Sequence, residues 1–342
     1  MNLVTGAAGH LGNVLVRELL DNHEKVRALV LPGEDLSSLH GLDVEIVEGN
    51  ILDPESIKPA FKNIEYVFHM AALVAITADK QDMLYKVNVE GTRNVIEEAK
   101  LAGVKRLIYT SSIHALQRPP EGVTIDETLP FDPENIAGAY DRTKAQASIL
   151  VLETARQGFD ALVVCPTGVI GPHDYRQSEV GGMILKWMKK NPSISVDGHF
   201  DFVDVRDVAK GHILARDNGK SGEIYLLSGE QVEISSVRQW VQSVVGIKTR
   251  EIKFSAPIAY LVAPLAEVYY KLTKTKPQFT RYSIETLQSN SKISSGKAIK
   301  ELGYKPRALF ESVRDTVLWW LHNLSKTSAS LRLPKKKSKN SI

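Results

Sequence analysis

The sequence predicts an α/β fold, in which a doubly wound parallel sheet is followed by a smaller mixed α/β C-terminal lobe. Two observations predict it. Through the first half, short apolar runs alternate with longer stretches of helical apolar spacing, and strands separated by helices form parallel sheets through right-handed crossovers. After residue 165 this alternation ends, and Gly, Pro and shorter elements dominate. We therefore expect a first domain at residues 1–165 and a second lobe at residues 166–324.

The individual elements follow from local patterns, in chain order. Strand-like runs in the first half cover residues 2–5, 25–31, 44–47, 65–69, 106–110 and 161–165. Helical spacing covers residues 11–20, 82–102 and 139–157, and glycine stops the last two stretches. In the second half we expect strands at 200–205 and 223–227, some of them returning to the main sheet, and helices at 234–245, 258–272 and 294–302. Residues 325–342, rich in Ser and Lys, are expected to be a disordered basic tail.

Composition excludes several classes of protein. The chain has 342 residues, with 43 Lys+Arg against 40 Asp+Glu, but six of the basic residues lie after Ser325, which leaves 37 against 40. The body therefore has no basic surplus for nucleic acid. A lone cysteine, Cys165, excludes an internal disulfide, and the nine histidines show no metal-ligand spacing, so we expect no metal. No apolar run reaches the roughly 18 residues of a membrane span. With no signal peptide before the first strand, we expect a cytoplasmic protein.

A glycine-rich loop lies between the first strand and the first helix. Residues 5–12 contain three glycines in the pattern G-x-x-G-x-x-G. Glycines let the backbone approach a pyrophosphate closely, and the helix that follows offers free N–H groups and a positive dipole end. The loop therefore predicts a Rossmann-type dinucleotide-binding domain. Its expected cofactor contacts are Gly6, Ala8, Gly9, His10, Leu11 and Gly12.

A tyrosine and a lysine four residues apart form the candidate catalytic pair. Tyr140 and Lys144 share one face of the predicted helix, and a nearby ammonium should lower the phenol pKa from about 10 toward neutrality. Such a tyrosine can serve as general acid or base for a carbonyl/alcohol pair. Residues 270–274 show the same spacing but lie in the late lobe, so we interpret them as packing or surface. Ser112, at the carboxyl end of a predicted parallel strand, can donate to the substrate oxygen.

With these three motifs in order, the chain resembles the extended short-chain dehydrogenase/reductase superfamily, or NAD-dependent epimerase/dehydratase family, over roughly residues 2–320. Segments 49–51, 69–72, 87–92 and 201–209 add to the resemblance. Segment 165–172 is more similar to dihydroflavonol reductases and 3β-hydroxysteroid dehydrogenases, since it lacks the Arg and Asn that sugar-nucleotide epimerases commonly carry there.

The resemblance implies roles for individual residues. Ser112, Tyr140 and Lys144 would form the catalytic triad, with Lys144 also holding the nicotinamide ribose. Asn88 would complete a tetrad, or else staple its helix to the sheet. The remaining implied cofactor contacts are Asn50 and Ile51 beside the adenine, Ala71 and Ala72 along the cofactor, and Pro166, Thr167 and Val169 at the nicotinamide.

The cofactor preference depends on the second predicted strand. Val30 is neutral where NAD enzymes place an acid for the ribose hydroxyls. Arg27 matches a basic position of NADP-using reductases in this family, whereas Leu31 stands where those enzymes often have a second arginine, and Glu34 and Asp35 follow. On balance we expect NADP, with NAD as the alternative.

The predicted function is NAD(P)-dependent interconversion of a carbonyl and an alcohol on a small, neutral or apolar substrate. Two alternatives remain open: a nucleotide-sugar epimerase or dehydratase with tightly bound NAD, and a catalytically silent NAD(P)-sensing protein. His114 is either a substrate contact or a loop residue. The resemblance implies a homodimer through helices 82–102 and 139–157. Residues 258–270 form a core or lid helix, or, with the tail, make a weak membrane-surface contact.

Overall fold

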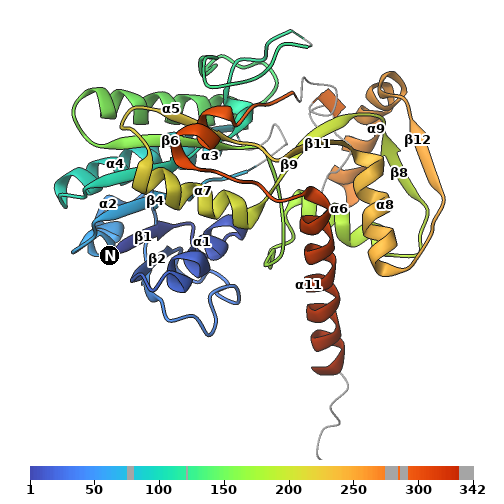
Figure 1. Ribbon diagram of the computed structural model, residues 1–342, viewed down its shortest axis with the longest axis horizontal. Helices are drawn as coiled ribbons and strands as arrows, with labels where there is room; N and C mark the ends of the chain where they lie inside the picture. Colours follow the sequence, from blue (N-terminus) through green and yellow to red (C-terminus); the bar gives the residue numbers. More distant parts are fainter. Residues whose placement is uncertain (75–80, 121, 274–283, 286–291, 331–342) are drawn as a thin grey trace, which may run out of the picture.

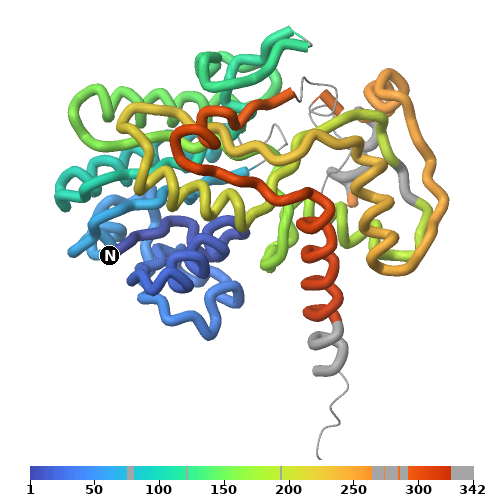
Figure 2. The backbone as a smooth tube through the Cα atoms, viewed as in Figure 1, coloured from blue at the N-terminus to red at the C-terminus, as the bar shows by residue number. Residues whose placement is uncertain are grey.

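The structure is a computed structural model that describes residues 1–74, 81–120, 122–273, 284–285 and 292–330 (Figures 1 and 2). Seven strands form one sheet in the order β10-β6-β5-β4-β1-β2-β3, and every neighbouring pair is parallel. The strands are β1 (Asn2–Thr5), β2 (Val26–Val30), β3 (Glu45–Glu48), β4 (Tyr66–His69), β5 (Arg106–Thr110), β6 (Ala161–Pro166) and β10 (Ile224–Leu227). The strand order reverses between β1 and β4, and open α/β sheets bind ligands at such a point.

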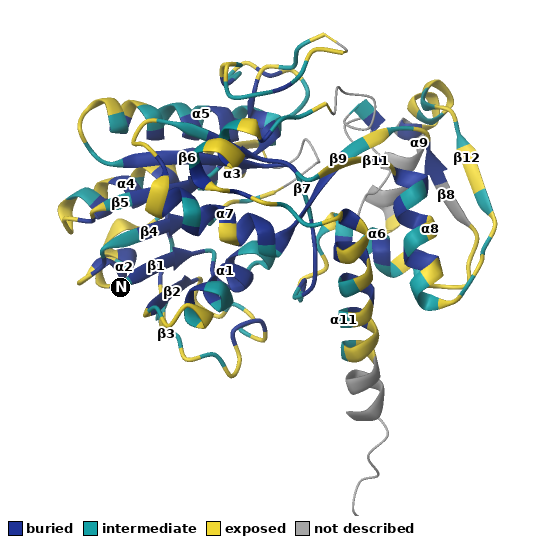
Figure 3. Ribbon diagram, viewed as in Figure 1, coloured by how far each residue is buried: buried dark blue, intermediate teal, exposed yellow. Residues whose placement is uncertain are grey.

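Helices cover both faces of this sheet, and its strands are almost fully buried except for the edge strand β3, which is mostly exposed (Figure 3). One face packs against α1 (His10–Asp21) and α7 (Val205–Asn218). The other packs against α2 (Pro54–Ile57), η1 (Lys58–Phe61), α4 (Gly91–Leu101) and α5 (Ala139–Arg156). This two-sided burial explains why the strand segments are nearly continuous apolar runs.

The second half forms a smaller lobe with its own core. It contains a three-stranded sheet, β11 (Glu230–Glu233), β9 (His199–Asp204) and β7 (Gly168–Ile170), and the parallel pair β12 (Glu251–Phe254) and β8 (Ser193–Val196). Its helices are α6 (Glu179–Trp187), α8 (Ile234–Val245), α9 (Ala256–Thr273) and α11 (Leu309–Ser330). Among the described strands of this half, β10 is the one that returns to the main sheet, beside β6. The predicted fold class is confirmed.

Several local predictions need correction. The predicted helix 82–102 is three segments, α3 (Gln81–Tyr85), a π-helical turn (Lys86–Glu90) and α4. The predicted strand 200–205 ends one residue early, because Asp204 caps α7 by accepting a hydrogen bond from the Arg206 N–H. Of helix 294–302, residues 296–302 are helical and end in a π-helical turn. Residues 325–330 continue α11 instead of opening a disordered tail, and the rest of that tail lies outside the described residues.

The described helices include none with both the length and the hydropathy needed to cross a bilayer.

Candidate active site

The glycine loop has the geometry that its sequence predicts. Gly6 adopts a left-handed φ of +66°, and a Cβ there would lie 2.8 Å from the Ala71 nitrogen, so the loop after β4 approaches it closely. A Cβ on Gly12 would lie 2.9 Å from the Ala7 Cα. Gly9 donates its N–H to the Gly6 carbonyl at 3.0 Å and is the N-cap of α1. The result is a side-chain-free cradle at a helix N-terminus, which fits a pyrophosphate.

A segment from the second lobe lies against this cradle. The His10 Nε2 is 2.9 Å from the Pro172 carbonyl oxygen, and Asn13 Nδ2 donates to the His173 carbonyl at 3.1 Å. Ala8, in the loop itself, accepts a hydrogen bond from Ser38 Oγ at 3.0 Å. Leu11, the second residue of α1, is half-buried and packs against the α1–α7 core. The glycine loop is thus held from both sides.

Asn88 joins the segment after β4 to α5 through its side-chain amide. Its amide Oδ1 accepts from the Leu73 N–H at 2.8 Å, and its Nδ2 donates to the Leu73 carbonyl at 3.0 Å and to Thr143 Oγ1 at 3.1 Å. These bonds hold the segment after β4, which carries Ala71 and Ala72, against α5. Of the two predicted roles for Asn88, these bonds support the staple, and its role as a catalytic residue stays a prediction.

The three candidate catalytic residues meet at the carboxyl edge of the sheet. Ser112 follows β5 and caps the short helix η4 (Ile113–Ala115), its Oγ accepting from the His114 N–H at 3.2 Å. Tyr140 lies in the first turn of α5 and hydrogen bonds to the Ser112 side chain. Lys144 is one turn further along, buried, and donates from Nζ to the Thr110 carbonyl at 2.5 Å. Its Nζ also lies 4.3 Å from the centre of the Tyr109 ring.

The protonation states differ from the expectation. Burial raises the pKa of the Tyr140 phenol above its usual range; the neighbouring Asp141 raises it further, and the Ser112 hydrogen bond lowers it. Burial also lowers the pKa of Lys144 to about 7. The predicted lowering of the tyrosine pKa by Lys144 is therefore wrong, because desolvation penalises the charged forms of both groups. Tyr140 is protonated at neutral pH and ready to donate a proton.

The other predicted cofactor contacts border the same edge. Asn50 and Ile51 lie in the turn after β3. Asn50 Oδ1 accepts a hydrogen bond from the Leu52 N–H at 3.0 Å, and Ile51 is buried against Gly91. Pro166 is the last residue of β6, and Val169, in β7, is half-buried. Thr167, between these strands, donates from Oγ1 to Asp201 at 2.6 Å.

Arg27 is the predicted site residue that lies elsewhere. It sits in the first half of β2, three residues or about 10 Å from the carboxyl end of that strand. Its Nη1 donates to the carbonyls of Ala60 and Lys62 at 2.9 and 2.7 Å, and its Nη2 pairs with Glu45 at 2.9 Å. In this structure the guanidinium therefore binds η1 and β3, and its role as a cofactor contact stays a prediction.

The charged pair at the end of β2 is a feature that sequence reasoning missed. Glu34 accepts from the Leu31 N–H at 2.9 Å and from Arg176 Nη2 at 2.6 Å. Leu31 directly follows β2, so the Glu34 carboxylate lies at the strand end. The acid four residues after Val30 was visible in the sequence, but Arg176 comes from a segment 142 positions away, and no local signal could have found it.

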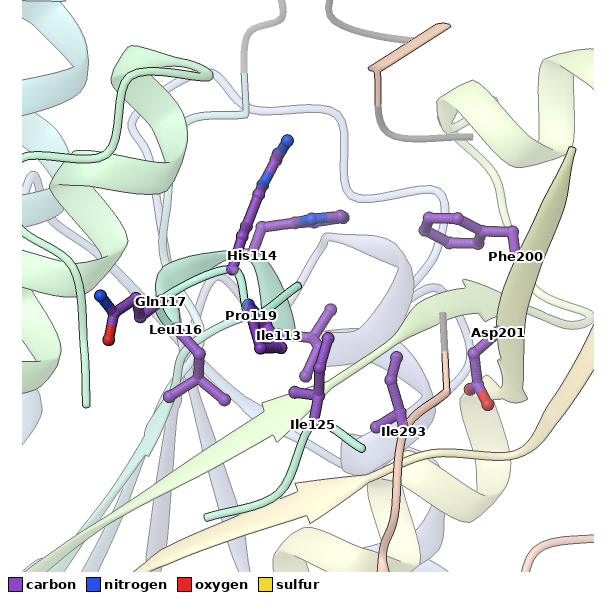
Figure 4. A pocket seen from close by; sticks show the side chains of 10 residues that line it. Ile113, His114, Leu116, Gln117, Pro119, Ile125, Phe200, Asp201 and Ile293 are labelled. Atoms are coloured by element: carbon purple, nitrogen blue, oxygen red, sulfur yellow. The ribbon is translucent and has the colours of Figure 1, made fainter. Parts of the chain in front are cut away.

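A mostly apolar pocket opens next to Ser112 (Figure 4). The rings of His114 and Phe200 point toward each other across it, with centres 5.9 Å apart. Burial lowers the pKa of His114 to about 4, so this imidazole is neutral at physiological pH. The structure therefore brings His114 to the candidate substrate pocket. The lining residues are Ile113, His114, Leu116, Gln117, Arg118, Pro119, Ile125, Phe200, Asp201 and Ile293.

In the part of the chain that the structure describes, no group of His, Cys, Asp and Glu side chains could hold a metal ion. Cys165, the lone cysteine, is fully buried in β6.

Comparisons with known proteins show what the whole chain is similar to. The NAD dependent epimerase/dehydratase family matches residues 2–228. The chain is 37% identical to "Sterol demethylase protein B" of Methylococcus capsulatus, over 93% of this chain and 97% of the relative. It is 28% identical to a decarboxylating "Sterol-4-alpha-carboxylate 3-dehydrogenase" of Schizosaccharomyces pombe, over 93% of this chain and 96% of the relative. The crystal structure of gox2253 superposes with a TM-score of 0.83 and 34% identity, covering 94% of this chain and 98% of that one.

Proposed function

The chain belongs to the NAD dependent epimerase/dehydratase family, and on that premise we propose that it is an NAD-dependent oxidoreductase that interconverts a secondary alcohol and a ketone on an apolar substrate. The observation that carries this proposal is the position of Ser112, Tyr140 and Lys144. They lie at the carboxyl edge of the sheet, with the glycine cradle at the same edge and the apolar pocket next to Ser112.

The mechanism follows from the hydrogen bonds of these residues. A bound nicotinamide cofactor supplies or accepts the hydride. Ser112 Oγ, which lies beside Tyr140, turns its hydroxyl hydrogen to the substrate oxygen. Tyr140 gives its proton to that oxygen as the carbonyl is reduced, and takes one back when the alcohol is oxidised. Lys144, which donates to the Thr110 carbonyl in this structure, would hold the ribose hydroxyls of the cofactor and so orient the nicotinamide.

We propose NAD in place of NADP as the cofactor. Arg27 was the residue that favoured NADP, and its guanidinium binds η1 and β3. Glu34 instead provides a carboxylate at the end of β2, where an acid accepts from the ribose hydroxyls and repels a 2′-phosphate. Glu34→Gln keeps the side-chain size and removes the charge. Titration by cofactor fluorescence should show about tenfold tighter NADPH binding in this variant; an unchanged preference would mean that Glu34 does not select the cofactor.

The substrate class follows from the pocket and from the relatives. Six of its ten lining residues are apolar, and its one arginine, Arg118, already pairs with Asp141. The apolar character of this lining, and not the pocket's open volume of about 30 Å³, favours an apolar ring system over a sugar diphosphate. Relatives named as sterol demethylase and sterol dehydrogenase proteins point the same way. We propose a hydroxyl or keto group on a sterol-like or other polycyclic terpenoid skeleton.

A spectrophotometric screen tests the proposal. NADH and NADPH oxidation would be followed with a panel of aldehydes, cyclic ketones and steroid ketones, and NAD⁺ reduction with the matching alcohols. We expect turnover with the polycyclic members. Protein that is purified with bound NAD and consumes no NADH with any carbonyl would instead favour the epimerase alternative. Protein that binds NADH but turns over no substrate in either direction would favour the sensing alternative.

Two contacts outside the site stay predictions. The homodimer through helices 82–102 and 139–157 is tested by sedimentation. The membrane-surface contact finds support in α9, whose first turns expose Ile258, Leu261 and Val262. It is tested by flotation with anionic vesicles, using a variant with polar residues at these three positions as the control.

A further inference from the structure

A buried ion pair adjoins the catalytic tyrosine and reaches the wall of the substrate pocket. Asp141, next to Tyr140 in α5, has a side chain that is 0% exposed. Its Oδ2 lies 3.2 Å from Nη2 of Arg118, whose side chain is 31% exposed and lines the pocket. Neither residue is needed to hold the cofactor or the reacting oxygen in the mechanism above, so the pair requires an explanation of its own.

We propose that the Arg118–Asp141 pair is a positioning element of the active site: Asp141 places a negative charge beside the Tyr140 phenol, and Arg118 offsets that charge from the pocket wall. Together they would set the pH range in which Tyr140 exchanges protons. This inference rests on the proposed function, because it assumes that Tyr140 is the proton donor and acceptor.

Burial makes both charges of the pair effective. A charge inside the protein is screened less than one in water, so a carboxylate next to a phenol disfavours the phenolate strongly. Asp141 is the largest cause, after burial itself, of the raised pKa of Tyr140. The charge of Arg118 also affects its neighbours inside the protein. After burial, it is the second cause of the lowered pKa of His114, which lines the same pocket.

The other groups near Tyr140 act from different elements. Lys144 is on the same helix, Ser112 follows β5, Tyr109 lies in β5, and Cys165 lies in β6. A Cys165 thiolate would raise the pKa of Tyr140, but burial raises the pKa of the Cys165 thiol to about 12, so this thiol is uncharged at neutral pH. Asp141 is therefore the nearby anion at neutral pH, and Arg118 is a cation paired with it.

The two partners of the pair consequently have opposite effects on Tyr140. Removing the carboxylate in Asp141→Asn makes the phenolate easier to form. Removing the cation in Arg118→Gln leaves the carboxylate less compensated and makes the phenolate harder to form. A pair that only held the loop after β5 against α5 would change activity in the same direction when either partner is replaced.

The experiment measures kcat/KM for alcohol oxidation at saturating NAD⁺ from pH 6 to pH 11. Relative to the wild type, the apparent pKa of the rising limb should fall by about one unit in Asp141→Asn and rise by about one unit in Arg118→Gln. On the rising limb this is about tenfold faster and tenfold slower oxidation at a given pH. Asp160→Asn is the matched control, because Asp160 pairs with Arg106 at 2.9 Å at the opposite edge of the sheet; its profile should match the wild type.

Shifts in the same direction for both variants, or no shift in either, would overturn the proposal. If Arg118→Gln does not fold, the double variant Arg118→Gln/Asp141→Asn decides, because it leaves no unpaired buried charge. Because the opposite effects of the two replacements cancel, its profile should return toward that of the wild type, and a double variant whose profile coincides with that of Asp141→Asn would refute the role of Arg118. A wild type that oxidises no alcohol contradicts the proposed function itself, whereas an active, Tyr140-dependent wild type with coincident variant profiles contradicts only the role of the pair.

Discussion

Replacing two glycines of the same loop by alanine should separate stability from cofactor binding. In Gly12→Ala the new methyl would overlap the Gly6 carbonyl oxygen and lie 2.9 Å from the Ala7 Cα. Backbone has to move to relieve this, which as overpacking costs about 2 kcal/mol. In Gly9→Ala the methyl would meet only the Gly6 oxygen, at 3.2 Å. Because Gly9 is the N-cap of α1, its replacement costs less than about 1 kcal/mol in the cofactor-free protein.

The effects on binding should be the reverse. Gly9 stands where the backbone approaches the pyrophosphate, so its methyl should cost about 2 kcal/mol of binding, or roughly thirtyfold in the Kd of NADH. Urea unfolding of the cofactor-free variants and fluorescence titration with NADH measure the two quantities. A Gly12→Ala protein as stable as the wild type would refute the predicted clash. A Gly9→Ala protein with unchanged NADH affinity would refute the placement of the pyrophosphate.

Two further predictions concern Arg27 and His69. Arg27→Gln should lower the free energy of unfolding by about 2 kcal/mol, because the buried guanidinium donates hydrogen bonds to two carbonyls and to Glu45. A selective loss of NADPH affinity in this variant would instead support the predicted cofactor role of Arg27. Burial lowers the pKa of His69 to about 3, so between about pH 6.5 and pH 3 the unfolded chain binds a proton that the folded protein does not. Stability therefore falls by about 1.4 kcal/mol per pH unit on acidification through this window. His69→Gln should lose about 2 kcal/mol less than the wild type between pH 7 and pH 5 in urea unfolding, and equal losses would contradict the assignment.

The first half of the fold was predictable because its strands, apart from the exposed edge strand β3, are buried on both faces and therefore read as short apolar runs between helices. The second half was harder. In α7, Val205, Val208, Ala209 and Ile213 have helical spacing and are buried, but the helix begins directly after β9 with no loop between them. The end of the strand and the start of the helix merge in the sequence, and the Asp204 cap is their only boundary signal. In α11, apolar residues at 309, 313, 317 and 320 form a buried stripe, although this helix was not among the predicted elements.

The candidate site, like the fold, was predictable from the sequence only in part. Motif order predicted which residues meet at the sheet edge, since Ser112 and Tyr140 follow from strand and helix positions alone. The hydrogen-bond partners of the Arg27 guanidinium were not predictable. They are the carbonyls of Ala60 in η1 and of Lys62 just after it, which lie 33 and 35 positions away in the sequence. The protonation states were not predictable either. Sequence spacing places Lys144 beside Tyr140, but their charges depend on how deeply each side chain is buried, and the spacing contains no information on burial.

The most direct test of the proposed mechanism is a single-turnover measurement on Tyr140→Phe. Enzyme loaded with NADH is mixed with a cyclic or steroid ketone that the wild type reduces, and the loss of NADH absorbance is followed. We predict that the rate falls roughly 10²- to 10⁴-fold while the Kd of NADH stays unchanged, because the variant loses only the proton donor. A Tyr140→Phe enzyme that reduces the ketone at the wild-type rate would contradict the mechanism.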